Sequence, residues 1–577
     1  MDNIYLVIND KQVAAAAGKT ILEVCRENGV NIPTICFHPS IKPLENCGVC
    51  VVEIEGRAEL AKSCATPAEN GMRVYTESAN AVSARISALS KILETHPNDC
   101  LGCAKTGGNC LLQEASYIYG VNPLERRDMK RGTDYSSLSL ARDLDKCIAC
   151  GRCVAVCEEV QGIGVYELVD TGSDRYADTK GGLPLSESGC INCGQCVKYC
   201  PVGALYEKDE VHKTADALRD PSKRVIFQVA PAVKNTAGEE FGLSGADVSR
   251  KLPTALRKLG ATVFTTDYTA DVTILEEGAE FIDRVTNNGV LPMFTSCCPG
   301  WVKYIETYYP QLLANLSSCK SPQQMFGALL KSYYAEKENI DPKDIFHVSI
   351  MPCLAKKYEK QRPEMVNHDT HLPDVDAVIT TREMTRLFRW FNIDLASLEG
   401  SEFDPMMGES SGAGRIFAAS GGVMEAALRT VIMKLTGNKI DKIDFIEVRD
   451  AEDMKEAELD IDGMKVRVAV VNGIGNARRV LDDAAAGVSP YHFIEFMACP
   501  GGCLGGGGSP IRGVNDIRKV SVYKSDADNP VRRSHENSEV IGLYSDYLGE
   551  PCGEKAHHLL HTHYVDRSGE NKRPRDE

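Results

Sequence analysis

The sequence predicts a multi-domain protein of mixed helix and strand (α+β), with a metal-rich first half and an α/β second half. A chain of 577 residues is too long for one hydrophobic core, so several domains are expected. The 23 cysteines fall largely into closely spaced groups, a pattern that indicates metal ligands rather than scattered buried thiols. After residue 210, strand-like runs alternate with helical stretches, which favours strands buried under helices.

The bulk composition excludes several function classes. Hydrophobic residues make up 43% of the chain and charged residues 25%, as in ordinary globular proteins. The sequence contains no run of about 18 apolar residues, so no membrane-spanning helix is predicted. The pattern at the N-terminus predicts a strand rather than a signal peptide. We therefore expect a cytoplasmic protein without membrane association, whose cysteines do not form disulfides. The net charge of -16 argues against nucleic-acid binding but permits local basic patches for an acidic redox partner.

Residues 1–80 are predicted to form the first domain. Segments 4–8 and 12–15 suggest a hairpin and 20–28 an amphipathic helix. Four cysteines in this region suit a [2Fe–2S] cluster with two thiolates on each iron, with zinc as the alternative: Cys36, Cys47, Cys50 and Cys64. The stretch resembles a β-grasp, plant-type-like ferredoxin module found in hydrogenases and in the large iron–sulfur subunit of respiratory complex I.

Residues 81–126 carry a second group of candidate ligands: His96, Cys100, Cys103 and Cys110. The same two families use a His-x3-Cys-x2-Cys pattern to ligate a [4Fe–4S] cluster, so this resemblance implies a His/Cys3 domain. A neutral imidazole in place of a thiolate removes one negative charge, which should raise the reduction potential. The last gap, of six residues, is one longer than in the family pattern, and Gly107 and Gly108 could absorb the extra residue.

Residues 127–209 contain the spacing of a bacterial two-cluster ferredoxin, repeated once. In this signature the fourth cysteine of each run ligates the other cluster. One [4Fe–4S] cluster is therefore predicted to use Cys147, Cys150, Cys153 and Cys200, and the other Cys190, Cys193, Cys196 and Cys157. We expect the modules of the first half to carry single electrons, in series along the chain. Cys25 and Cys319 are interpreted as buried thiols.

Residues 210–577 are predicted to form an α/β domain of two lobes. The strand-like runs are 225–229, 262–265, 348–351, 377–380 and 466–471, and two of the helices are 248–259 and 422–434. Three cysteine motifs lie at the ends of such elements, where α/β proteins place their sites. They are Thr-Ser-Cys297-Cys298-Pro-Gly-Trp301, Met351-Pro-Cys353-Leu-Ala-Lys356-Lys357 and Met497-Ala-Cys499-Pro-Gly-Gly-Cys503.

In combination these motifs resemble those of the iron-only ([FeFe]) hydrogenases, of the monomeric clostridial type with four accessory clusters. The resemblance implies an H-cluster, in which Cys298, Cys353, Cys499 and Cys503 hold a [4Fe–4S] unit. Cys503 would bridge to a two-iron subcluster with carbon monoxide, cyanide and azadithiolate ligands, installed by maturation proteins. It implies a ferredoxin hydrogenase, in which protons and reduced ferredoxin give dihydrogen and oxidised ferredoxin reversibly. Flavodoxin is the alternative electron partner.

The same resemblance implies a proton path. Cys297 lies beside the ligand Cys298 and is the candidate proton donor, because a spare thiol can cycle between thiol and thiolate. Glu277 and Glu280 are three residues apart, so on a helix they would share a face. Arg284 and Ser317 match the remaining relay positions, although the neighbouring Ser318 is an alternative to Ser317.

Lys356 is expected to donate to a cyanide nitrogen. Further residues are expected to line the subcluster: Ala230, Pro231, Gln323, Met351, Phe417 and Met497. Ala232 stands where some relatives have a serine, so that hydrogen bond should be missing, whereas Ser509 in place of glutamine should cost no ligand. The Gly473-Ile-Gly475 segment is interpreted as a tight strand–helix turn.

The C-terminal region is less informative. Cys552, His557, His558, His561 and His563 could suggest a further metal site, but the stretch resembles the ordinary ending of these hydrogenases, so a structural role is favoured. Residues 567–577 are charged and are expected to be disordered. Two other functions remain open: the catalytic subunit of an NADH-coupled multi-subunit hydrogenase, and a hydrogen sensor or a relative acting in iron–sulfur assembly. Cys297 and the full relay favour turnover.

Overall fold

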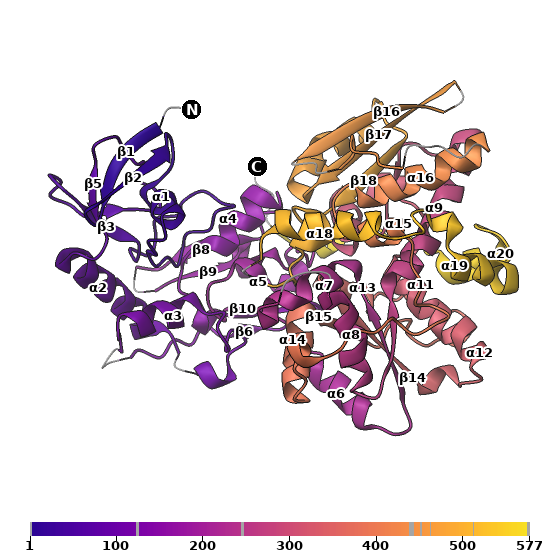
Figure 1. The fold of residues 1–577 in the computed structure, drawn as a ribbon, viewed down its shortest axis with the longest axis horizontal. Helices are drawn as coiled ribbons and strands as arrows, with labels where there is room; N and C mark the ends of the chain where they lie inside the picture. The colour runs from indigo at the N-terminus through magenta and orange to yellow at the C-terminus, as the bar shows by residue number, and fades with distance from the viewer. Residues whose placement is uncertain are drawn as a thin grey trace.

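The computed structural model describes residues 3–97, 99–122, 126–172, 174–243, 247–437, 443–449, 453–461, 463–511 and 513–573. The chain forms an elongated molecule (Figure 1). Its N-terminal sheet lies at one end, the two lobes of the second half lie at the other, and the middle segment connects them. Within the described residues, no helix is both long and apolar enough to cross a bilayer.

The N-terminal sheet has five strands in the order β2-β1-β5-β3-β4. β1 and β2 form the antiparallel hairpin that the sequence predicts, and β1 pairs with β5 in parallel. Helix α1 (Ile21–Glu27) begins at a capping box, in which Thr20 and Glu23 bond each other's backbone N–H groups. The strands are β1 (Asn3–Ile8), β2 (Lys11–Ala16), β3 (Val51–Ile54), β4 (Ala61–Lys62) and β5 (Arg73–Tyr75).

The middle segment consists of short elements around cysteine-bearing loops. It contains α2 (Ala79–Thr95), α3 (Leu111–Ile118), α4 (Arg152–Ala155), α5 (Gln195–Tyr199), β6 (Thr133–Asp134), β7 (Leu140–Asp143), β8 (Tyr166–Asp170), β9 (Arg175–Thr179) and β10 (Leu205–Glu207). Helices α4 and α5 each follow a glycine in the left-handed region, Gly151 and Gly194. This repetition agrees with the duplicated cysteine spacing.

The first lobe of the second half is built on a parallel four-stranded sheet, in the order β12-β11-β14-β15. Every predicted strand of this lobe is present: β11 (Arg224–Val229), β12 (Thr262–Thr265), β14 (Ile345–Met351) and β15 (Ala377–Thr380). Helices α6 (Val211–Arg219), α8 (Asp247–Arg257) and α14 (Thr381–Trp390) pack with these strands in one buried apolar cluster. The sheet is therefore covered by helices, as parallel sheets require.

The second lobe carries a four-stranded sheet in the order β13-β18-β17-β16. Its strands are β13 (Met293–Phe294), β16 (Met454–Ile461), β17 (Met464–Asn472) and β18 (Phe493–Met497). Helices of the second half that bear on the site or the tail are α7 (Pro231–Thr236), α9 (Thr266–Thr286), α10 (Pro299–Tyr308), α13 (Ala355–Glu359), α15 (Gly412–Ile416), α16 (Gly422–Thr436), α17 (Ala477–Ala485), α18 (Asn515–Ala527) and α20 (Glu554–Leu560). Figure 1 shows β16–β18 on one side and β14–β15 on the other, with α7 and α18 between them.

The predicted turn at Gly473–Gly475 is present, between β17 and α17, with Gly473 in the left-handed region. It has a second role, because the Gly475 backbone lies against Gly162 of the middle segment, and a Cβ at Gly162 would sit 3.1 Å from the Gly475 Cα. The two halves of the chain thus approach each other backbone to backbone at this point.

The expectation that residues 567–577 are disordered is wrong for 567–573, and residues 574–577 lie outside the described part of the chain. Arg567 forms ion pairs with Glu306 and Glu364. Arg573 donates to the carbonyl oxygens of Ile163 (2.6 Å) and Gly164 (2.9 Å). Charge alone was a misleading signal, because these cations have buried acceptors elsewhere in the fold.

Candidate active site and metal centres

The four cysteines of the N-terminal domain converge. The Sγ atoms of Cys50 and Cys64 are 3.3 Å apart. A hydrogen bond with Cys36 lowers the pKa of the Cys47 thiol to about 5, and the same bond raises the pKa of Cys36. The pKa of Cys64 is raised by its bond to Cys50, by burial and by the charges of the other three thiols. Four reduced thiols in mutual contact fit a cluster with two sulfurs on each iron.

In the second candidate group, the three cysteines lie close enough together to influence one another, and His96 remains a predicted fourth ligand. Burial raises the pKa of the Cys110 thiol and the charges of Cys103 and Cys100 raise it further, while the Gln113 N–H donates to its sulfur at 3.4 Å. Burial lowers the pKa of His96, which favours the neutral imidazole that a metal needs. Its Nδ1 is buried and has no hydrogen-bond partner among the described residues. Gly107 and Gly108 both have positive φ, as the longer loop requires.

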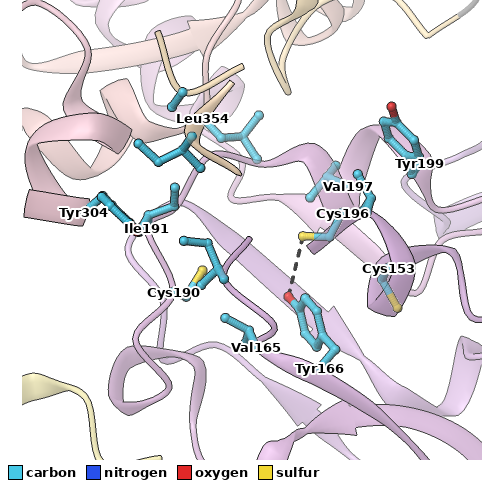
Figure 2. Close-up of a cluster of buried hydrophobic side chains, with 14 of the residues drawn as sticks. Cys153, Val165, Tyr166, Cys190, Ile191, Cys196, Val197, Tyr199, Tyr304 and Leu354 are labelled. Carbon is cyan, nitrogen blue, oxygen red and sulfur yellow. Dashed lines mark hydrogen bonds between the residues drawn. The ribbon is translucent and has the colours of Figure 1, made fainter. Parts of the chain in front are cut away.

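The two-cluster segment contains two cavities, each lined by four cysteines. One is lined by Cys147, Cys150, Cys153 and Cys200. The other is lined by Cys190, Cys193, Cys196 and Cys157. The fourth cysteine of each run therefore faces the cavity of the other run, which is the exchange predicted from the spacing. Tyr166 borders both cavities, and its hydroxyl lies 3.5 Å from the Cys196 sulfur (Figure 2).

Both N-terminal groups reach the same one of these cavities. From the first domain, Asn46 Nδ2 donates to the Cys150 carbonyl (3.3 Å). Burial lowers the pKa of the Arg152 guanidinium, and the charges of nearby thiols partly offset this effect. These thiols belong to both groups: Cys150, Cys200, Cys36 and Cys47. From the His96 group, Leu111 N donates to the Pro201 carbonyl (3.0 Å), and a Cβ on Gly203 would overlap the Cys103 sulfur. The first domain and the His96 group therefore both contact the segments that carry Cys150 and Cys200.

The other cavity faces the second half of the chain. After burial, the charge of Cys499 is the largest influence that raises the pKa of Cys193. Gln195 and Lys198 donate to the Gly505 carbonyl at 2.9 and 3.2 Å. A Cβ on Gly507 would lie 2.6 Å from the Cys193 carbonyl oxygen, so Gly507 packs directly on this loop without a side chain. Leu354, from the second cysteine motif, lies against the same loop, because a Cβ on Gly194 would sit 2.8 Å from its Cδ2.

The three cysteine motifs of the second half meet where strands of the two sheets end. Cys298 is the N-cap of α10 and follows β13, Cys353 follows β14, and Cys499 and Cys503 follow β18. Burial raises the pKa of the Cys353 thiol, and the charges of Cys499, Cys298 and Cys503 raise it further. The loop after Cys503 is held there by the Gly508 N–H, which donates to the Pro352 carbonyl at 2.7 Å. Cys499 is buried and the other three are half-buried, and these four neighbouring thiols form a donor set that fits a cubane cluster.

Cys297 lies beside this set. Burial raises the pKa of its thiol well above the ordinary value, and Glu277, Cys298 and Cys503 raise it further, whereas Lys356 acts in the opposite direction. The ammonium group of Lys356 donates to the Cys297 carbonyl at 3.1 Å. The raised pKa favours the protonated thiol, and Cys297 packs against the same apolar cluster as the candidate ligands Cys298 and Cys503.

The predicted relay residues form a connected group on α9 and the 317–318 segment. Arg284 Nη2 donates to Glu280 Oε1 (2.6 Å), and the Ser317 hydroxyl donates to Glu280 Oε2 (2.7 Å). Ser318 differs, because its backbone N–H points to Glu280 while its hydroxyl is 2.8 Å from His561 Nδ1. Arg284 and Glu280 are mostly buried but reach solvent, so the group extends towards the surface.

Glu277 is the buried inner member of this group. Burial raises its pKa to about 8 and the charge of Glu280 adds to the shift, while the Ser296 N–H and the Ser317 hydroxyl oppose it. Neither carboxyl oxygen has a partner of normal hydrogen-bond geometry among the described residues. An unpartnered buried carboxyl with a pKa near neutrality suits a group that accepts and releases protons.

The remaining predicted residues surround the four thiols. Phe417 and Met497 belong to the same apolar cluster as Cys297, Cys298 and Cys503. Ala230, Pro231 and Met351 are buried at the ends of β11 and β14. Ala232 is fully buried and offers no hydroxyl, and the Ser509 hydroxyl turns to the Cys503 carbonyl at 3.5 Å.

Glu359 is a buried residue at this site that sequence reasoning missed. Lys356 donates to both of its carboxyl oxygens, at 3.2 and 3.0 Å, and Gln323 Nε2 donates to one of them at 3.0 Å. Burial lowers the pKa of Lys356, but Glu359 and the neighbouring thiols raise it by more, so the ammonium stays charged. The available signal was the spacing, because a glutamate three residues after a lysine can share its face of a helix.

Comparison with known proteins identifies five regions. The second half matches the iron only hydrogenase large subunit, C-terminal domain (223–507) and the iron hydrogenase small subunit (514–567). The first half matches a 2Fe-2S iron-sulfur cluster binding domain (2–79), the NADH-ubiquinone oxidoreductase-G iron-sulfur binding region (85–123) and a 4Fe-4S dicluster domain (146–204). The chain is thus a multi-domain protein with matches to both kinds of accessory cluster domain and to the hydrogenase catalytic domain.

Two relatives match over nearly their whole length. The NADP-reducing hydrogenase subunit HndD of Solidesulfovibrio fructosivorans is 44% identical over 98% of this chain and 100% of its own. Iron hydrogenase 1 of Clostridium pasteurianum is 40% identical over 97% of this chain and 99% of its own. Among solved structures, the [FeFe]-hydrogenase HydA1 of Chlamydomonas reinhardtii superposes with a TM-score of 0.57 at 42% identity, covering 63% of this chain and all of that one.

Proposed function

The chain belongs to the iron-only hydrogenase family, and from this premise we infer how its residues divide the work. It is an [FeFe]-hydrogenase, an oxidoreductase that interconverts protons, electrons and dihydrogen. Its cofactors are [2Fe–2S] and [4Fe–4S] clusters and the H-cluster. When bound, the H-cluster supplies the iron centre at which protons and electrons combine.

We propose four domains, with boundaries that follow the ligand groups. Residues 1–80 form a β-grasp domain for the [2Fe–2S] cluster, 81–126 a His/Cys3 [4Fe–4S] domain, 127–209 a two-cluster ferredoxin domain, and 210–577 a two-lobed H-cluster domain. In the first and third domains, the proposed ligands are supported by mutual influence among four thiols or by four cysteines lining one cavity. In the second domain, the proximity of Cys100, Cys103 and Cys110 supports three ligands, and His96 is proposed as the fourth. In the last domain the proposed ligands are Cys298, Cys353, Cys499 and Cys503, supported by the charges of the neighbouring thiols, which raise the pKa values of Cys353 and Cys503.

Electrons enter by two branches in this proposal. One begins at the N-terminal domain and the other at the His96 group, and they join at the cluster held by Cys147, Cys150, Cys153 and Cys200. The contacts of Asn46 and Arg152 support the first branch. The contact of Leu111 with Pro201 and the bare backbone at Gly203 support the second. Cys190, Cys193, Cys196 and Cys157 would hold the second ferredoxin cluster, which would supply electrons to the active site where Cys193 and Cys499 are neighbours.

Protons travel from Arg284 through Glu280, Ser317 and Glu277 to Cys297. The hydrogen bonds Arg284–Glu280 and Ser317–Glu280 support the outer part of this path. The raised pKa of Glu277, about 8, supports the inner part, because this carboxyl can both take a proton from Ser317 and give one to the Cys297 thiolate. Cys297 then holds the proton at its sulfur beside the iron site.

The second-sphere residues would hold the two-iron unit in place. Lys356 would donate to a cyanide ligand, and Glu359 keeps its ammonium charged and oriented. Gln323 is fixed at both ends of its amide, by Glu359 and by the Ser349 hydroxyl (2.9 Å). Met351, Phe417 and Met497, with Ala230 and Pro231, would exclude water from the subcluster.

The observation that carries the proposal is the position of Cys297, a thiol that is not one of the four proposed ligands. It lies near these ligands and near the buried carboxyl of Glu277. The test is Cys297→Ala in the matured enzyme. We expect the full iron content and the infrared bands of carbon monoxide and cyanide to remain while dihydrogen evolution with reduced viologen is nearly abolished. Activity close to that of the wild type would contradict the relay.

The electron partner has two candidates. Ferredoxin, or flavodoxin in its place, fits a chain that acts as a monomer with its own accessory clusters. The 44% identity to a subunit of an NADP-reducing hydrogenase favours an alternative, in which pyridine-nucleotide-linked subunits deliver the electrons. Affinity purification from the native source followed by native mass spectrometry separates them. A monomer that reduces ferredoxin with dihydrogen supports the first, and a stable complex with flavin-containing subunits supports the second.

A further inference from the structure

Three potential metal-ligating side chains meet outside every site described above. Glu276 lies on α9, Cys552 lies just before α20, and His561 follows α20 directly. One donor atom from each of them lies within 4.8 Å of the other two. Glu276 and His561 are buried, whereas Cys552 is open to solvent, so an ion has a route from bulk water.

The buried donors are held in position through their other atoms. The Tyr544 hydroxyl donates to Glu276 Oε1, which leaves Oε2 facing His561 Nε2 at 3.0 Å. The opposite nitrogen of His561, Nδ1, is bonded to the Ser318 hydroxyl at 2.8 Å. Metal-binding histidines and carboxylates in proteins characteristically have such orienting partners on the atom that does not face the metal.

The backbone at Cys552 is also unusual. Its φ is 58°, in the left-handed region that residues with a Cβ rarely adopt. In this conformation the Cys552 N–H donates to Glu276 Oε2 (2.7 Å) and its thiol lies 3.4 Å from the Glu276 carbonyl. This conformation keeps the thiol sulfur within 4.8 Å of the other two donor atoms, and such backbone strain tends to persist where it has a function.

The chemistry of the three donors selects the ion. Thiolate, imidazole and carboxylate are the ligands that Zn²⁺ and similar transition ions prefer, whereas Mg²⁺ and Ca²⁺ require oxygen shells. Three protein ligands with solvent access leave a fourth position for water. We propose that Glu276, Cys552 and His561 form a binding site for one divalent transition-metal ion of the zinc class. On binding, the thiol proton leaves to water and the sulfur becomes a ligand.

Two other candidate groups are less suitable. Glu280, Cys319 and His561 also have donor atoms within 4.8 Å of one another, but Glu280 is bonded to Arg284 and Ser317, and Cys319 is fully buried. A third group consists of the carboxylates Glu425, Asp444 and Asp526. Its members are neutralised by the arginines Arg429, Arg449 and Arg532.

The test uses the matured enzyme with all of its clusters. One equivalent of Zn²⁺ is added, loosely held zinc is removed by gel filtration, and zinc K-edge X-ray absorption is recorded, in which the iron clusters do not interfere. We expect one retained zinc with a single sulfur at about 2.3 Å and nitrogen or oxygen ligands at about 2.0 Å. Cys552→Ala should lose the sulfur shell and the retained zinc. Its fold should survive, because alanine has the same Cβ in the left-handed conformation.

His558→Ala is the matched control. His558 lies on the same helix, α20, but faces Asp369 outside the triad, so this variant should bind zinc as the wild type does. The proposal is overturned if the wild type retains no zinc or if its zinc shell contains no sulfur. It is also overturned if a multi-sulfur shell persists in Cys552→Ala, because the ion would then occupy an empty cluster site.

Discussion

Ser317→Ala tests the proton path at the step where the structure separates two neighbouring serines. The Ser317 hydroxyl donates to Glu280 Oε2 at 2.7 Å and lies close enough to Glu277 to lower its pKa. It is therefore the side chain that can connect the two carboxyl groups. Alanine at this position removes the connection and leaves the rest of Glu280's contacts, with Arg284 and the Ser318 N–H, in place.

Two magnitudes follow from these contacts. Loss of one hydrogen bond to a charged group should cost about 1.5–3 kcal/mol of folding free energy, which a domain with the remaining Glu280 contacts can tolerate. Loss of a positioned proton carrier should slow the reaction by roughly 10²–10⁴-fold, an increase of ~3–5 kcal/mol in the barrier. The variant should therefore be folded and fully loaded with iron but nearly inactive.

The assay is dihydrogen evolution from reduced viologen, normalised to iron content and to the infrared bands of the H-cluster. The rate is compared in H₂O and D₂O, because a broken relay should make proton transfer rate-limiting and increase the isotope effect. Ser318→Ala is the matched control, since its hydroxyl bonds His561 rather than Glu280. The reasoning is refuted if Ser317→Ala turns over like the wild type, or if Ser318→Ala is equally slow.

Three further predictions concern single sites. The pKa of Glu277 is about 8 in the folded protein, against an ordinary value of 4.5 for the unfolded chain. Because the folded state binds this proton more tightly, the carboxyl stabilises the fold below pH 4.5, and this stabilisation is lost as the pH rises through 8. The melting temperature of the wild type should therefore fall relative to that of Glu277→Gln between about pH 5 and about pH 9, and a constant difference would contradict the shift. Gly203→Ala should displace Cys103 and remove one cluster from the iron count and the electron paramagnetic resonance spectrum, whereas Gly102→Ala, with no atom within 4 Å of its Cβ, should keep it. His96→Cys should lower the reduction potential of its cluster in a redox titration, because a thiolate adds negative charge; an unchanged potential would mean that His96 is not a ligand.

Local patterns in the sequence predicted the elements well, because each depends on neighbours a few residues away. The strand 262–265 and the strand 377–380 agree with the structure at both ends, and the hairpin and first helix of the chain are present as expected. The cysteine spacings also predicted which side chains line each cavity of the two-cluster segment. Ligand spacing is informative at long range because one cluster must satisfy the same short metal–sulfur distances from every ligand.

Contacts between distant segments were harder to predict. The sequence favoured Ser317 over Ser318 by register alone, whereas the structure separates them by which hydroxyl faces α9. The contacts of the two N-terminal ligand groups with the segments at Cys150 and Cys200 were likewise missed, since they join residues far apart in the chain. Residues 567–573 were misjudged for the same reason, because the acceptors of Arg573 lie about 400 positions earlier in the chain.

The glycine run 505–508 has a consequence for the rate at which electrons reach the active site. The rate of electron tunnelling falls steeply as the distance between donor and acceptor increases. Here the distance is kept short because the glycines have no side chains. A methyl group on Gly507 would meet the Cys193 carbonyl, and one on Gly508 would meet Thr380. Even a methyl side chain in this stretch would widen the gap and slow electron transfer to the active site. The metal ligands and the proton-path residues would be unchanged.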